Sequence, residues 1–155
     1  MFKLGKLTDY GAVVMTALAA DPAQVHSAHD LADGTGLSAP TVSKLLKMLA
    51  KSGLVEALRG ARGGYRLARA AEFITVAEII GAIEGPIALT ECVEHRGACS
   101  MESNCATSAN WHLINTAIQQ ALSAVTLAQM TRPARRAAHE IPLTFHPARR
   151  ADDAV

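Results

Sequence analysis

The chain has 155 residues, half of them apolar and only 4% aromatic, which fits one small domain with an appendage and a core of mainly aliphatic side chains. The formal net charge is +1, but residues 38–69 carry seven Lys and Arg against Glu56 alone, a local net charge of +6. No stretch approaches the ~18 uninterrupted apolar residues of a transmembrane helix, which excludes a membrane-spanning chain.

The first predicted helix runs from about Leu7 to Ala20, because its apolar residues follow helical spacing. Thr8 and Asp9, near its start, are candidate N-capping residues. Lysines ahead of this apolar run resemble a secretory signal, but Asp9 and Thr16 favour a helix of the folded domain. We therefore expect a cytoplasmic protein, in which clustered cysteines bind metal or react more often than they form disulfides.

The next two predicted helices form a helix-turn-helix pattern. Ser27 and Asp30 make a capping box for a short helix that Gly34 and Gly36 end. The third helix runs from Ser38 to Gly53 and has two faces. Its inward face holds Val42, Leu45, Leu46 and Leu49, and its opposite face holds Lys44, Lys47 and Lys51.

A β-hairpin is predicted directly after the third helix. The β-prone runs Leu54–Arg59 and Tyr65–Leu67 flank a glycine-rich tip at residues 60–64. A fourth helix, Val76–Glu84, follows Thr75 and ends at Gly85. The predicted fold is therefore mainly α, a winged helix-turn-helix domain.

The basic residues of the third helix and the hairpin are candidates for DNA contact. In a helix-turn-helix domain the start of the recognition helix reaches base edges, and residues further along it meet phosphates. Arginines beside the wing tip suit a minor groove. The alternative is that this charged helix face is merely solvated. Because the basic residues coincide with a predicted helix-turn-helix and wing, DNA binding is favoured. The predicted base readers are Thr41, Ser43 and Lys44, and the full DNA-binding set is Ser38, Thr41, Ser43, Lys44, Lys47, Lys51, Arg59 and Arg62.

A long helix is predicted from about Ser108 to Met130, which at 1.5 Å per residue spans about 35 Å. This is longer than a small winged domain needs, so we expect the helix to pack against a second copy, with packing on its own domain as the alternative. Residues 131–155 have no sustained period and are predicted to form a flexible tail. The apolar stripe of the helix is Ile114, Ala117, Ile118, Ala121, Leu122, Val125 and Ala128.

All three cysteines, Cys92, Cys99 and Cys105, lie in one acidic stretch with the spacing C-x6-C-x5-C. Three thiolates need a fourth ligand to close a tetrahedral metal site or to complete an iron–sulfur cluster. Structural zinc sites favour C-x2-C pairs, so the longer spacers favour a cluster. A thiol switch without metal is the alternative, since one cysteine could resolve a sulfenic acid on another. No catalytic motif is recognisable, and we expect no enzyme.

The start KLTDYG, the helix SAPTVSKLLKMLAKSGLV, the wing RGARGGYRLA and the cysteine loop followed by a helix together resemble the Rrf-type family of winged-helix regulators over about residues 1–130. The resemblance implies a dimeric transcription factor that binds operator DNA and carries an iron–sulfur cluster, with [2Fe–2S] favoured over [4Fe–4S]. The start and the loop most resemble regulators of the SUF iron–sulfur assembly genes, which act as repressors. A nitric-oxide- or redox-sensing repressor of the same family, or a zinc-stabilised DNA-binding module, are the alternatives.

The resemblance also bears on the fourth ligand. IscR-like members use a histidine three residues after the last cysteine, and Ser108 occupies that position here. NsrR-like members use a carboxylate near the N-terminus of the partner subunit, and Asp9 matches it. His112 and then His95 are the remaining candidates, and Asp9 could instead cap the first helix. The expected division is a DNA-binding domain at 1–89, a cluster loop at 90–107, a dimerisation helix at 108–130 and a tail at 131–155.

Overall fold

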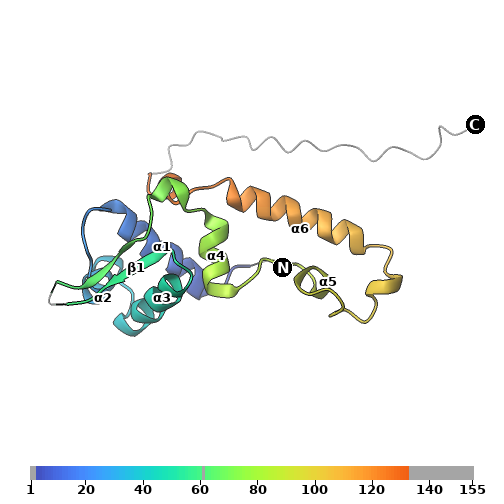
Figure 1. Cartoon of the computed structure of the whole chain (residues 1–155), viewed down its shortest axis with the longest axis horizontal. Coiled ribbons are helices and arrows are strands. Elements are labelled where there is room, and N and C mark those ends of the chain that lie inside the picture. Colours follow the sequence, from blue (N-terminus) through green and yellow to red (C-terminus); the bar gives the residue numbers. More distant parts are fainter. Residues whose placement is uncertain (1–2, 61, 133–155) are drawn as a thin grey trace, which may run out of the picture.

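The computed structural model describes residues 3–60 and 62–132. Figure 1 shows a helical domain with a small hairpin at one end of the molecule and α6 leading away from it. This arrangement confirms the predicted mainly α, winged helix-turn-helix class. The helices of the domain are α1 (Lys6–Ala20), α2 (Ala28–Thr35), α3 (Ala39–Lys51) and α4 (Val76–Glu84), and the strands are β1 (Val55–Leu58) and β2 (Gly64–Leu67).

Local capping signals set the ends of the short helices. The Ser27 hydroxyl accepts a hydrogen bond from the backbone of Asp30, whose carboxylate accepts one from the backbone of Ser27, so the predicted capping box of α2 is present. Gly36 ends α2 with φ +71°, a left-handed conformation that glycine adopts without a Cβ penalty. Thr75 and Glu78 form the same reciprocal box at the start of α4. These boundaries follow directly from the sequence.

The core of the domain is aliphatic and holds α3 in a fixed rotation. The predicted inward face of α3 is fully buried. Each such side chain contributes roughly 1.5–3 kcal/mol on burial, so the rotation that exposes the opposite, lysine-bearing face is strongly favoured. Other fully buried side chains are Val14, Met15 and Leu18 of α1, Ile79 of α4, and Ile74 and Leu127 from the segments beyond the hairpin.

The hairpin is antiparallel, with Val55 opposite Leu67 and Leu58 opposite Gly64. The segment before α2 adds one more rung, since His26 and Tyr65 exchange backbone hydrogen bonds of 2.9 and 2.8 Å. The wing is thereby attached both to α3, which leads into β1, and to the segment that leads into α2. A 3-10 turn, Ala71–Phe73, connects the hairpin to α4 and was not predicted.

The prediction of one long helix over residues 108–130 is wrong beyond Ser123. Helix α6 covers Ser108–Ser123, and a separate short helix α7 covers Leu127–Met130. Thr126 between them has extended backbone and caps α7 in a box with Gln129. Pairing with the segment before α4 imposes this break: the Val76 N–H donates to the Val125 carbonyl at 2.9 Å, and the Leu127 N–H donates to the Ile74 carbonyl at 2.8 Å.

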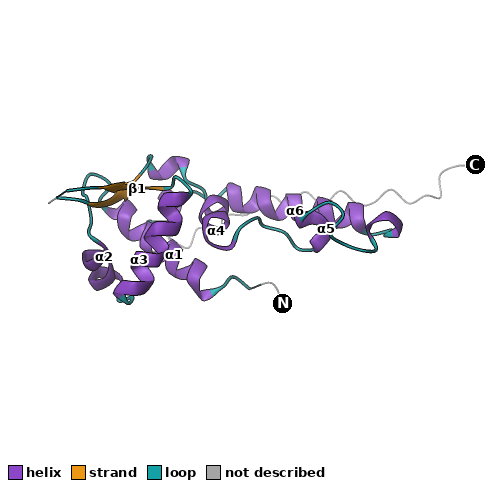
Figure 2. Cartoon of the chain, turned by 60° about the horizontal axis from the view of Figure 1, so that its bottom comes forward, coloured by secondary structure: helices purple, strands orange, loops and turns teal. Residues whose placement is uncertain are grey.

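Residues 90–107, called the cysteine segment below, connect α4 to α6. They contain a helical turn α5 (Glu91–Glu94) and a 3-10 turn (Glu102–Asn104), neither of which was predicted. Figures 1 and 2 both place α5 beside α6, away from the hairpin, and the two helices are in contact. No helix in the described ranges is both long and apolar enough to cross a membrane. Of the predicted tail, residues 133–155 lie outside the described residues.

Candidate nucleic-acid interface and cysteine segment

The start of α3 presents hydroxyl groups and a lysine at the surface. Ser38 is the N-cap residue, and its hydroxyl lies 2.8 Å from that of Thr41 instead of capping the helix. Thr41 and Ser43 are half-buried, and Lys44 is exposed. These side chains lie in the first two turns, the part of a recognition helix that reaches base edges when it enters a major groove. The predicted base readers are thus together at one helix end.

Five cations of the α3–wing region remain unpaired within the described chain, although residues 38–69 hold seven Lys and Arg. Arg66 pairs with Glu56 across the hairpin at 2.9 Å. Arg69 pairs with Glu78 of α4. The five that carry no ion pair with a described residue are Lys44, Lys47, Lys51, Arg59 and Arg62, and all five are exposed. This set coincides with the cations that the sequence assigned to DNA.

The cysteine segment holds its thiols in three different settings. Cys92 lies in α5 and is 6% exposed, and its sulfur is 3.2 Å from the Thr90 hydroxyl. Cys99 and Cys105 are half-buried, and all three cysteines are free thiols. The Cys105 sulfur lies 3.3 Å from the Thr107 hydroxyl. This hydrogen bond, assisted by the backbone N–H groups of Thr107 and Ser108, lowers the pKa of the Cys105 thiol.

The donor set suits an iron–sulfur cluster in its chemistry, since free thiols on one segment are the soft ligands that such clusters take. The described chain does not gather them, however. No three His, Cys, Asp or Glu side chains in the described ranges lie close enough together to hold a metal ion. A site that uses all three thiols would therefore require the segment to rearrange, whichever residue supplies the fourth ligand.

The candidate fourth ligands are spread over the molecule. Asp9 lies exposed in the first turn of α1, whereas His95 ends α5 and His112 lies in the second turn of α6, both exposed. Asp9 does not cap α1, because the N-cap residue is Gly5 and receives no side-chain cap from within the helix. The capping acceptor is Glu84 instead, whose carboxylate binds the Gly5 N–H at 2.8 Å. The alternative role of Asp9 as the cap of the first helix is therefore not observed.

A buried asparagine on α6, which was not predicted as a functional residue, anchors the stretch of chain that connects α4 to the cysteine segment. Asn115 is 4% exposed, and its amide donates to the Ile87 carbonyl at 2.9 Å while its oxygen accepts from the Leu89 N–H at 3.1 Å. Gln119 adds a second donor to the Ile87 carbonyl at 3.1 Å. The sequence did carry a signal for this role, because Asn115 is a polar residue inside an apolar helical stripe. A polar side chain at such a buried position normally has hydrogen-bond partners.

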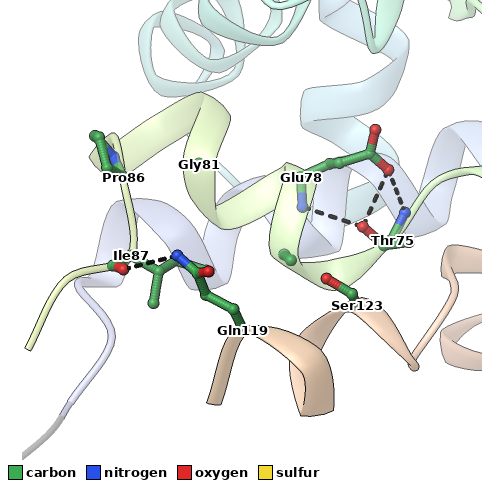
Figure 3. A pocket seen from close by; sticks show the side chains of 8 residues that line it. Thr75, Glu78, Gly81, Pro86, Ile87, Gln119 and Ser123 are labelled. Atoms are coloured by element: carbon green, nitrogen blue, oxygen red, sulfur yellow. Dashed lines mark hydrogen bonds between the residues drawn. The ribbon is translucent and has the colours of Figure 1, made fainter. Parts of the chain in front are cut away.

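A shallow open cavity of about 290 Å³ lies between α4 and α6 (Figure 3). The Thr75 and Glu78 capping box forms one wall, and the Gln119 side chain reaches across to Ile87. Thr75 and Glu78 are therefore engaged in capping α4, and Gln119 in holding the linker between α4 and Cys92 (residues 85–91) against α6. The cavity shows how α6 is attached to the winged domain through hydrogen bonds as well as apolar contact.

Helix α6 leaves part of its apolar stripe uncovered. Ile114 is 43% exposed, and Leu113 and Trp111 beside it are 70% and 39% exposed. Further along, Ile118, Ala121 and Leu122 are half-buried by the chain itself. The alternative of packing on its own domain thus holds for the second half of α6, whereas the first half presents large apolar side chains to solvent, and its packing against a second copy stays a prediction.

Comparison with known proteins gives a consistent result. The model of the Rrf2 family, described as an iron-dependent transcriptional regulator, matches residues 4–133. The chain is 35% identical over 108 residues to Protein rrf2 of Nitratidesulfovibrio vulgaris, which covers 70% of this chain and 72% of that one. Among solved structures, CymR, the global cysteine regulator of B. subtilis, superposes with a TM-score of 0.66 at 30% identity, over 84% of this chain and 97% of its own. IscR of T. potens gives a TM-score of 0.62 at 32% identity, over 83% and 85%.

Proposed function

Because the chain belongs to the Rrf2 family of iron-dependent transcriptional regulators, we propose that it is a homodimeric repressor of iron–sulfur cluster assembly (SUF) genes whose affinity for DNA follows the state of an iron–sulfur cluster. The observation that carries the proposal is the pairing of two surfaces in one chain. Cations unpaired within the described chain lie on α3 and the wing, and three free thiols lie on the cysteine segment. Such a regulator acts on chromosomal DNA, in the cytoplasm.

Two groups of residues would divide the work of DNA binding. Lys47, Lys51 and the wing arginines would neutralise phosphates or enter a minor groove, which supplies affinity and salt dependence. The hydroxyls of Ser38, Thr41 and Ser43, with Lys44, would contact base edges, which supplies sequence discrimination. The exposed positions of these cations, unpaired within the described chain, support this division.

Cys92, Cys99 and Cys105 are the proposed cluster ligands, with [2Fe–2S] favoured over [4Fe–4S]. A bound cluster would supply a redox-sensitive centre that can be lost. Ligation would draw the three thiolates together and order the cysteine segment, whose thiols stand apart in the described chain. Asp9 is the proposed fourth ligand, contributed by a second copy, because its carboxylate is exposed and is not used as a helix cap.

The first half of α6 is the proposed dimer interface. Trp111 and Ile114 lie one turn apart on an exposed apolar face of this helix, and Leu113 is exposed on the face next to Ile114. Monomeric proteins rarely leave extended apolar surface uncovered. A second copy is the favoured occupant, because helix-turn-helix domains read paired half-sites as symmetric dimers.

A second candidate function, thiol-based redox sensing without a cluster, is favoured by one observation. The lowered pKa of Cys105 raises its thiolate fraction, and a half-buried thiolate is open to oxidation. CymR of Staphylococcus aureus, to which the chain is also similar, has been solved in an oxidized form, which is consistent with a regulator that responds to oxidation.

Anaerobic purification separates these functions. The cluster proposal predicts brown protein with visible absorbance and matching iron and sulfide contents, both lost in a Cys99→Ala variant. Colourless protein that holds one zinc ion would refute it in favour of a zinc-stabilised module. Colourless, metal-free protein whose DNA binding changes with peroxide would favour the thiol sensor, and a change with nitric oxide only in the brown form would point to a gas sensor.

A further inference from the structure

The carboxylate of Glu84, the last residue of α4, holds the first turn of α1. Its Oε1 accepts a hydrogen bond from the Gly5 N–H at 2.8 Å and a second one from the Thr8 hydroxyl. Glu84 therefore performs at a distance of 79 residues the capping that helices usually obtain from their own N-cap side chain. A carboxylate at this end also complements the positive end of the helix dipole.

This contact is close and partly buried. Thr8 is 2% exposed, and a Cβ at Gly5 would lie only 2.8 Å from the Glu84 oxygen. One turn and a half further along α1, a Cβ at Gly11 would lie 2.1 Å from the Cδ1 of Ile83. A side chain at Gly5 would displace the Glu84 carboxylate, and one at Gly11 would displace the Ile83 side chain. The end of α4 and the start of α1 are thus held together by a polar cap and an apolar contact at once.

The contact between the end of α4 and the start of α1 lies between the two parts of the chain that carry the proposed function, α3 and the cysteine segment. Gly11 also faces α3, since its Cβ would lie 3.5 Å from a Leu45 methyl carbon, so the position of α1 bears on the recognition helix. On the other side, residues 85–91 lead from Glu84 directly to Cys92. The middle of that linker is fixed to α6 by Asn115. A linker that is hydrogen-bonded in this way transmits a displacement that a free loop would absorb.

We propose that Glu84 is a positioning residue that couples the order of the cysteine segment to the position of α1, and through α1 to α3. The proposal deepens the proposed function and rests on it for the direction of signalling. Rearrangement of the three thiols shifts the linker, the linker shifts the end of α4, and the Glu84 carboxylate carries that shift to the first turn of α1. Loss of order at the end of α4 would withdraw the one oxygen that accepts both hydrogen bonds from the start of α1, and loss of those bonds would in turn free the end of α4.

Substitution of Thr8 provides a matched pair of variants. Thr8→Val removes the hydroxyl and keeps the shape of this buried side chain, whereas Thr8→Ser keeps the hydroxyl and serves as the rescue control. Glu84→Gln is an independent variant that keeps the shape and removes the charge. Glu72→Gln, on an exposed glutamate of the turn before α4, controls for the loss of one negative charge.

Hydrogen exchange of the full-length, cluster-free protein tests the coupling without DNA or metal. We expect amides of residues 85–91 to exchange about tenfold faster in Thr8→Val and Glu84→Gln, and at the wild-type rate in Thr8→Ser and Glu72→Gln. A purely local cap would speed exchange in residues 5–11 alone, and that result would overturn the proposal.

Operator binding then tests the signal. In the wild type we expect the cluster-loaded and cluster-free forms to differ in their affinity for the operator. In Thr8→Val the ratio of these two affinities should fall toward one, whereas Thr8→Ser should retain the wild-type ratio. An unchanged ratio in Thr8→Val, with faster exchange in the linker, would also overturn the proposal as a signalling route. Wild-type protein that binds DNA equally well in both forms would instead refute the proposed function, and the exchange data would still decide whether Glu84 ties the two segments together.

Discussion

Substitution of Asn115 by alanine removes the side chain that anchors the linker to α6, and the structure sets the size of the effect. The Leu89 N–H loses its partner, whereas the Ile87 carbonyl keeps a donor in Gln119. One unsatisfied, part-buried donor and one lost hydrogen bond together cost about 2 kcal/mol. Alanine recovers about 0.5 kcal/mol through its better helix propensity, which leaves a net loss of about 1.5 kcal/mol in the free energy of unfolding.

For a chain of this size a loss of 1 kcal/mol lowers Tm by about 2–4 °C, so Asn115→Ala should melt about 3–6 °C below the wild type. Thermal unfolding of the cluster-free protein, followed by circular dichroism, measures this shift. Gln120→Ala, at an exposed position on the same helix, is the control and should leave Tm unchanged or slightly raised. A shift below about 1 °C in Asn115→Ala would mean that the linker is not held by this side chain, and the argument for a transmitted displacement would fail with it.

The remaining predictions concern the two functional surfaces. Lys47→Ala should lower the slope of log K against log salt by about 0.9, measured by fluorescence anisotropy, and an unchanged slope would exclude a phosphate contact at this position. Thr107→Val should raise the pH at which Cys105 becomes half-reactive toward iodoacetamide, because the hydroxyl that lowers the pKa of this thiol is removed; identical pH profiles would contradict that cause. Leu113→Glu should dissociate the dimer in sedimentation experiments by placing a charge in the interface, and a persistent dimer would move the interface elsewhere. Asp9→Ala should speed cluster loss under air, whereas unchanged retention would redirect the search to His112.

The winged domain was predictable because its signals are local. The capping box of Ser27 and Asp30, the left-handed Gly36 and the period of the α3 core residues each act within a few positions of the chain. The break at Thr126 was missed because the apolar period continues across it, and the pairing that causes the break comes from residues 74–76. One local signal was available, since Thr126 and Gln129 have the spacing of a capping box.

The candidate site was predictable in its residue types and less so in its geometry. The five predicted DNA-binding cations were chosen by their place on the lysine face of α3 or beside the wing tip. They are the ones that remain unpaired within the described chain, whereas the ion pairs of Arg66 and Arg69 were not predicted. The roles of Glu84 and Asn115 could not be predicted in the same way. Their partners lie 76–79 and 26–28 residues away in the chain, and only the folded arrangement of α1, α4 and α6 brings them together.

The central claim, that the state of the cysteine segment sets DNA affinity, is tested most directly by one titration. Sheared genomic DNA from the source organism is selected on the immobilised protein, and the most enriched fragment serves as the probe in anaerobic fluorescence anisotropy. We predict that protein reconstituted with iron and sulfide and the same protein after removal of the cluster differ at least tenfold in Kd, and that Cys99→Ala binds like the cluster-free form under both treatments. Equal Kd values for the two forms of the wild type would contradict the account.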